Sequence, residues 1–169
     1  ATCSASGSSL NVKSMYSLRA LVLNGTLAPR GHQNEGDIRM STTLNQDGLE
    51  ARRRVLGDEY VDRALTGLDT FNTEFQQLVT DYCWGRVWTR TTLDDRQRSL
   101  INLSMIAALN RADEFKTHVR GALRNGCTVD EIRDTLLQVA VYCGIPAGVE
   151  AFRLARQVFD VEGVTPAPA

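Results

Sequence analysis

The chain has 169 residues, of which 43% are hydrophobic and 23% are charged. A chain of this length buries one sizeable core, so we expect one folded domain. Nineteen basic residues and 20 acidic residues give a formal net charge of -1. This balance predicts neither a nucleic-acid partner nor attraction to an anionic membrane surface, and it favours a small-molecule or protein partner.

The four cysteines are scattered, without a CxxC pair, at Cys3, Cys83, Cys127 and Cys143. Such spacing is typical of reduced thiols in a cytoplasmic protein, where Cys83 and Cys143 are expected to pack as small hydrophobic residues. No stretch approaches the roughly 18 to 20 apolar residues of a membrane span. We therefore predict a cytoplasmic protein that does not enter the membrane.

Residues 1–39 differ in composition from the rest, since they are rich in small polar residues and turn formers and show no helical period. Met40, followed by Ser41, Thr42 and Thr43, reads like a natural start. We interpret residues 1–39 as a leader of uncertain origin, non-native or dispensable, with a targeting peptide as the alternative. Residues 40–163 are the predicted domain.

From Asn45 onward the pattern is helical, which predicts an all-α domain. Residues 49–65 predict two short amphipathic helices, because Gly57 weakens the middle of that segment. Residues 68–88 predict one longer helix whose buried face contains apolar side chains at three- and four-residue steps. These are Phe71, Phe75, Leu78, Val79, Tyr82 and Cys83.

Residues 95–110 are apolar on nearly all sides, which predicts a helix at the centre of a bundle. A more polar helix over residues 112–125 ends at Gly126, and Thr128 with Glu131 predicts a capping box for the next helix. In that helix Leu137, Val141 and Tyr142 widen the apolar arc, which predicts a subunit interface. A last helix follows Pro146, and residues 164–169 are a predicted flexible tail.

A polar triplet at Arg111, Glu114 and His118 has the spacing i, i+3 and i+7, which places all three on one stripe if the helix includes them. His118 is the only histidine in the predicted domain, and imidazole titrates near neutral pH. Glu114 can orient it, and Arg111 can pair with Glu114 or with an anionic substrate. The alternative is an ordinary surface ion pair beside a packed histidine.

Trp88 and Arg90 belong to an aromatic and basic cluster at residues 82–90. Such a cluster fits either the wall of an anion pocket or an amphipathic edge of the core with solvated arginines. One histidine with scattered carboxylates falls short of the usual metal ligand sets, so we predict no metal. A glycine-rich phosphate loop and a GxSxG elbow are both absent from the sequence.

Four segments resemble the carboxymuconolactone decarboxylase family, and residues 40–163 are similar to it as a whole. The segments are WGRVWTR at 84–90, LDDRQRSLINLSMIAALNR at 93–111, EFKTHVRGALRNG at 114–126 and EIRDTLLQVAVYCGIPAGVEAF at 131–152. The resemblance implies the all-helical alkylhydroperoxidase D-like fold. It also implies a homo-oligomer, often a trimer or hexamer.

The peroxidase-type branch of that fold carries a CxxCxxxH motif on the corresponding helix. Here Arg111 and Glu114 stand at the two cysteine positions, and His118 keeps the histidine. This departure removes disulfide chemistry and leaves a site suited to acid-base work.

The reaction that the resemblance implies converts 4-carboxymuconolactone to 3-oxoadipate enol-lactone and CO2 in the β-ketoadipate pathway of aromatic catabolism. It needs no cofactor, because the unsaturated lactone accepts the electrons. His118 is then the expected acid, Glu114 its orienting partner or proton relay, and Arg111 an anion clamp. The substrate-binding residues implied by resemblance and charge are Arg98, Arg90 and Trp88.

Two other functions stay open from the residues alone. One is a thiol peroxidase or disulfide reductase on the same fold, against which the missing CxxC argues. The other is a non-catalytic helical oligomer that binds a small ligand or another protein. Fold likeness does not separate these three, because function resides in the site.

Overall fold

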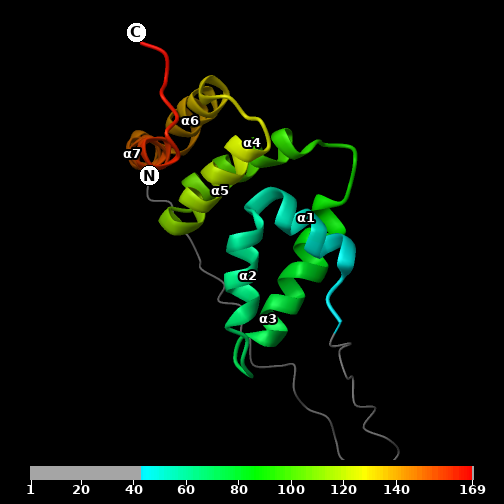
Figure 1. Ribbon diagram of the computed structural model, residues 1–169. Helices are drawn as coiled ribbons and strands as arrows, with labels where there is room; N and C mark the ends of the chain where they lie inside the picture. Colours follow the sequence, from blue (N-terminus) through cyan, green and yellow to red (C-terminus); the bar gives the residue numbers. More distant parts are fainter. Residues whose placement is uncertain (1–42, 169) are drawn as a thin grey trace, which may run out of the picture. The chain divides into compact units, whose positions relative to one another are not determined.

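A computed structural model describes residues 43–168, and all of them belong to one unit, Met40–Ala169 (Figure 1). Within these residues every regular element is a helix, so the all-α prediction is confirmed. The predicted leader lies outside the described residues. The elements are α1 (Gln46–Leu56), α2 (Asp58–Thr66), α3 (Thr73–Leu78), η1 (Val79–Trp88), α4 (Asp95–Ala108), α5 (Ala112–Arg124), α6 (Val129–Cys143) and α7 (Ile145–Glu162).

Gly57 separates α1 from α2, as the sequence predicts. Its backbone has φ 88° and ψ 152°, a conformation that side-chain-bearing residues rarely adopt. A Cβ at this position would also meet the Arg124 guanidinium at 2.9 Å. The glycine therefore serves the turn and the approach of α5 to the end of α1.

The predicted helix over residues 68–88 is wrong in its start and in its buried face. Helix α3 begins at Thr73 and continues directly into η1, a π-helix. The buried side chains still recur at three- and four-residue steps, but they lie on a different face from the predicted one. The inward side chains are Gln77, Thr80, Trp84 and Trp88, whereas Phe71, Phe75, Leu78, Tyr82 and Cys83 are exposed.

Helix α1 packs along η1, and the two backbones approach closely at glycines. A Cβ on Gly48 would lie 2.4 Å from the Thr80 carbonyl oxygen and 2.8 Å from the Gly85 nitrogen. Ala51 and Val55 of α1 form a small core with Trp84 and Trp88, whose stacked rings lie 4.9 Å apart. The glycine contact therefore sets how far the tryptophans reach toward α1.

A buried arginine crosses the same interface. Arg52 donates from Nη1 to the Thr80 hydroxyl at 3.1 Å and from Nη2 to the Gln76 side chain at 2.9 Å. Burial lowers its pKa, while nearby Tyr60 and Cys83 act in the opposite direction. Hydrogen bonds to neutral groups rather than an ion pair therefore hold this guanidinium.

The main core lies among α4, α5, α6 and α7, with Leu103, Phe115, Val119, Ile132 and Val158 among its buried members. Helix α4 is not buried on all sides, which corrects the sequence prediction. Its apolar residues divide into an inward face and an exposed one, since Leu103 and Ala107 are buried while Ile101 and Met105 are exposed. Within the single chain, α4 thus flanks the core instead of filling its centre.

The end of the chain packs α7 antiparallel to α6 after Gly144. The Thr128–Glu131 capping box is present, as predicted. Leu137, Val141 and Tyr142 are exposed, as the wide apolar arc predicts, but Cys143 and Cys83 are exposed too and are not core residues. Beyond α7, the Val164 nitrogen donates to the Phe159 carbonyl at 2.9 Å, and Val164 contacts the core.

Candidate functional site

The connection between α4 and α5 is only three residues long, from Leu109 to Arg111. The Asn110 nitrogen donates to the Ala107 carbonyl, and the Arg111 nitrogen donates to the Ile106 carbonyl. This is the double hydrogen bond of a helix end that needs a left-handed residue, and Asn110 has φ 54°. Asparagine tolerates that conformation better than most residues other than glycine. The turn brings α5 back alongside α4.

Arg111 does not lie on the helix with Glu114 and His118, which corrects the three-residue stripe. It is the N-cap residue of α5, with φ -98° and ψ 83°, so its side chain does not follow the helical spacing. Glu114 and His118 do share α5, one turn apart. The predicted triplet is therefore a pair on α5 and an arginine in the preceding connection.

His118 is half-buried, and burial lowers the pKa of its imidazole. The carboxylate of Glu114 acts in the opposite direction and raises the pKa of His118, but the effect of burial is larger. In the free protein the neutral form of His118 is thus favoured at neutral pH. The imidazolium, once formed, is a stronger acid than an exposed one.

The position of His118 on α5 follows from its neighbours. Gly121, three residues later on the same stripe, lies against Val55 of α1, since a Cβ there would meet the Val55 carbonyl oxygen at 3.2 Å. Val55 belongs to the small core with Trp84 and Trp88. The face of α5 that carries Glu114 and His118 is therefore the face on the α1 side.

A cavity of about 140 Å³ lies beside Trp88, and we call it the Trp88 pocket. Trp88 itself is buried, and Arg98 and Asn102 are half-buried on one face of α4. The remaining lining is apolar. The full lining is Val87, Trp88, Leu93, Arg98, Ile101, Asn102 and Met105.

Arg98 is only partly satisfied in this pocket. Its Nη2 donates to the Arg90 carbonyl oxygen at 3.1 Å. Its Nε is buried and has no hydrogen-bond partner within the described residues. A buried N–H without a partner is costly, and an anionic ligand oxygen would satisfy it.

Trp88, Arg90 and Arg98 lie close together, but Arg90 and Arg98 contribute different groups there. Arg90 supplies its backbone carbonyl to Arg98, and it also lines a neighbouring surface hollow that shares Trp88 with the pocket. The charged residues around that hollow are Arg54 and the carboxylates of Asp47, Glu50, Asp94 and Asp95. Those carboxylates make that hollow a poor place for an anionic substrate. Trp88 therefore lines both cavities, the pocket together with Arg98 and the acidic hollow together with Arg90.

Helices α4 and α5 are antiparallel, and this sets the level of His118 against the Trp88 pocket. The Asn125 side-chain amide donates to the Ser99 hydroxyl at 2.9 Å, which pairs the end of α5 with the start of α4. The same amide donates to the Asp95 carbonyl at 3.5 Å, so counting back along α5 places His118 level with residues 102–106 of α4. No hydrogen bond or ion pair within residues 43–168 links His118 to Arg98.

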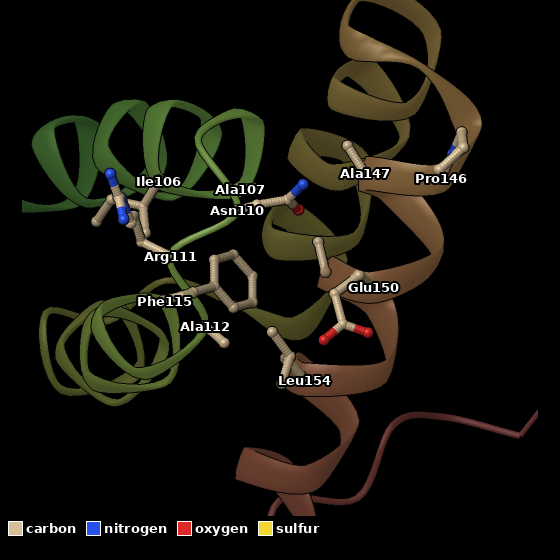
Figure 2. A pocket seen from close by; sticks show the side chains of 11 residues that line it. Ile106, Ala107, Asn110, Arg111, Ala112, Phe115, Pro146, Ala147, Glu150 and Leu154 are labelled. Carbon is tan, nitrogen blue, oxygen red and sulfur yellow. The ribbon is translucent and has the colours of Figure 1, made fainter.

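A second cavity, of about 330 Å³, lies between the α4–α5 connection and α7, and we call it the Asn110 pocket. Figure 2 shows the Asn110 side chain reaching toward Ala147 of α7, with Phe115 and Leu154 below it. The Arg111 guanidinium lies beside Ile106, on the far side of the connection from Glu150. Glu150 is itself paired with Arg153, and that pairing lowers its pKa.

Sequence reasoning missed Asn102, Asn110 and Glu150 as pocket residues. The sequence spacing could have predicted Asn102, because it follows Arg98 by four residues and so shares its helix face. Glu150 had none, since only the packing of α7 against the α4–α5 connection places it there.

A profile of the Carboxymuconolactone decarboxylase family matches residues 73–157 of this chain. The 4-carboxymuconolactone decarboxylase of Acinetobacter baylyi is 39% identical over 121 residues, which cover 72% of this chain and 90% of that protein. A second protein with that name, from Pseudomonas putida, is 50% identical over 38 residues, covering 22% of this chain and 79% of that protein.

A relative with a different substrate in its name matches equally well. The nitrosuccinic acid decarboxylase of Metarhizium robertsii is 41% identical over 117 residues, which cover 69% of this chain and 82% of that protein. The matched regions include the helices that form the Trp88 pocket and carry His118. Both named activities remove CO2 from a carboxylic acid.

Proposed function

We propose that the substrate of this chain is 4-carboxymuconolactone. The chain belongs to the carboxymuconolactone decarboxylase family, whose fold is all-α and alkylhydroperoxidase D-like, and it is a decarboxylase. The products are 3-oxoadipate enol-lactone and CO2, which places the reaction in the β-ketoadipate pathway. The similarity to the Acinetobacter enzyme over 90% of its length supports this substrate.

The observation that carries the proposal is the unpartnered Nε of Arg98 in the wall of the Trp88 pocket. A substrate carboxylate there accepts a charge-assisted hydrogen bond from a group that otherwise has none. The indole of Trp88 and the apolar lining then contact the lactone ring. We assign the carboxylate-holding role to Arg98 rather than to Arg90 or Arg111, whose guanidiniums lie elsewhere.

The chemistry assigns the protein three tasks. The bond between the ring carbon and the departing carboxylate breaks, and its electron pair moves through the ring double bond toward the lactone carbonyl oxygen. A proton then adds to the ring carbon beside the carbonyl, so one CO2 forms and one proton is consumed. The protein holds the carboxylates, stabilises the charge on oxygen and delivers the proton.

His118 delivers the proton in this proposal, and Glu114 supports it. The burial that lowers the pKa of His118 favours the neutral imidazole in the free protein. A substrate carrying negative charge opposes this shift when it binds, because a nearby anion stabilises the imidazolium. His118 thus takes a proton from solvent as the substrate binds and gives it to carbon after CO2 leaves.

A second candidate substrate is nitrosuccinic acid, which the similarity to the Metarhizium enzyme favours. Loss of CO2 beside a nitro group places the electron pair on the nitro oxygens, so the demands on the site are alike. A carboxylate must be held, an oxygen gains charge and carbon is protonated. The same residues serve either substrate.

The test is CO2 release from enzymatically generated 4-carboxymuconolactone, and in parallel from nitrosuccinic acid, by the purified full chain without added metal or cofactor. We expect fast release from the lactone and a loss of at least about a hundredfold in His118→Ala, since positioned acids contribute that much. Thr117→Ala, at the half-buried neighbour of His118 on α5, is the matched control and should keep the parent rate.

Release from nitrosuccinic acid alone would replace the substrate and keep the reaction class. Release from neither substrate by folded protein would overturn the proposed function. A His118→Ala variant within about tenfold of the parent would remove the acid role from His118 while leaving the substrate in place.

A further inference from the structure

The Trp88 pocket has one uncharged amide in its lining, and it belongs to Asn102. Asn102 follows Arg98 by four residues, so the two side chains stand one turn apart on the same face of α4. Asn102 is half-buried, and its amide makes no hydrogen bond to another described residue. An amide in this position keeps two N–H donors available to a ligand.

We propose that Asn102 donates a hydrogen bond to the substrate oxygen that becomes negative when CO2 leaves. The inference rests on the proposed function, and it fills the one task of that reaction to which neither His118 nor Arg98 is assigned. With the lactone, this oxygen is the ring carbonyl. With nitrosuccinic acid, it is an oxygen of the nitro group.

The spacing of the two donors fits this division of roles. Four residues of α-helix separate Arg98 from Asn102 by about 6 Å along the axis. Arg98 therefore holds a carboxylate at one end of the pocket while Asn102 meets an oxygen further along the same molecule. His118, on α5, lies level with residues 102–106 of α4, at the Asn102 end of the pocket.

An amide suits a charge that appears only during the reaction. It does not ionise near neutral pH, so it donates a hydrogen bond to the growing charge without surrendering its proton. The walls beside it are apolar, at Trp88, Ile101 and Met105. Water is displaced from such a surface when the substrate binds, which strengthens the interaction in the transition state.

The experiment compares Asn102→Asp and Asn102→Leu in the full chain, using CO2 release from whichever of the two substrates the parent protein accepts. Both replacements are close to asparagine in size and neither donates a hydrogen bond from its tip at neutral pH. We expect kcat to fall about a hundredfold to a thousandfold in both variants, as when one oxyanion donor is removed elsewhere. KM should change little in Asn102→Leu but rise in Asn102→Asp, because the new carboxylate repels an anionic substrate and can pair with Arg98. Asn102→Ser, which retains a shorter donor, should lie between these variants and the parent.

Arg98→Lys provides the contrast, because loss of the carboxylate contact should raise KM. Ser104→Ala is the matched control, since Ser104 is half-buried on the same helix but donates to the Leu100 carbonyl at 3.0 Å instead of facing the pocket. It should behave as the parent does. Circular dichroism and thermal unfolding establish that each variant is folded.

A kcat within about threefold of the parent in both Asn102→Asp and Asn102→Leu would overturn the role of Asn102. So would a rise in KM without a fall in kcat, because that pattern reports ground-state binding. These outcomes differ from failure of the proposed function, in which the parent protein releases no CO2 from either substrate.

Discussion

At the scale of the residue, His118 experiences two opposing influences on its pKa, burial and the carboxylate of Glu114. Burial is the larger, so the pKa lies below its ordinary value of about 6.5. Arg98 is the counterpart on α4, a cation with one N–H that no described residue satisfies. An anionic substrate would give the Arg98 Nε a hydrogen-bond acceptor and would stabilise the protonated form of His118.

The pH dependence of turnover follows from the pKa of His118. If His118 must be protonated to act as the acid, kcat/KM falls as the pH rises through its pKa in the free protein, which lies below about 6.5. The corresponding fall in kcat occurs at higher pH, because the bound anionic substrate raises that pKa. Measuring kcat and kcat/KM between about pH 5 and 8 locates both falls.

Glu114→Gln tests the assigned partner. The carboxylate of Glu114 raises the pKa of His118, so kcat/KM should fall at a lower pH once that carboxylate is removed. Asp113→Asn, which alters an exposed acidic residue in the same first turn, is the control and should leave that pH unchanged. If kcat/KM falls at the same pH in Glu114→Gln as in the parent, Glu114 has no part in the proton transfer.

At the scale of the element, the contact between α1 and η1 depends on two glycines whose backbones approach closely. The π-helix places Trp84 and Trp88 against α1, and Trp88 then walls the pocket that contains Arg98. The pocket thus depends on how η1 packs against α1, which apolar periodicity does not reveal.

Gly48→Ala tests this contact. The added Cβ would meet backbone atoms of Thr80 and Gly85 that cannot move aside without shifting η1. We expect a loss of about 1–3 kcal/mol in the free energy of unfolding, the usual cost of overpacking, measured by urea denaturation. Gly67→Ala is the matched control, because a Cβ added there would meet no atom within 4 Å and the φ of Gly67 is -92°.

Gly67→Ala should be neutral or slightly stabilising, since alanine restricts the unfolded chain. An equally stable Gly48→Ala protein would show that α1 and η1 do not approach as closely as described. Reduced CO2 release from a folded Gly48→Ala protein would link the contact to the Trp88 pocket.

At the scale of the whole molecule, apolar surface remains uncovered over the described residues. Exposed members include Val141, Tyr142, Ile145 and Val149 around the α6–α7 turn. Ile101 and Met105 on α4 and Leu109 just after it are exposed as well. Contiguous apolar surface of this kind marks interaction sites. No helix among residues 43–168 combines the length and hydropathy needed to cross a bilayer.

We predict that copies of the chain associate through the surface at the α6–α7 turn, as a trimer or hexamer. Val141 is 75% exposed and Tyr142 is 80% exposed, so a charge at either position costs the single chain little but disfavours association. Sedimentation should show a smaller species for Val141→Lys than for the parent. Gln138→Lys, at an exposed polar neighbour on α6, should leave the assembly intact. A parent protein that sediments as a monomer would contradict the prediction.

The helical class, the glycine break at Gly57 and the capping box at Thr128 can be read from the amino-acid sequence, because each depends on neighbours within a few residues. The placement of Glu114 one turn before His118 on α5 is readable in the same way. Other features arise only when the chain packs. The predicted buried face of residues 71–83 lies outward except at Val79, and the α4–α5 turn took Arg111 off the helix. The Trp88 pocket forms where the end of η1 and the connection after it fold back onto α4, and local spacing does not encode that packing.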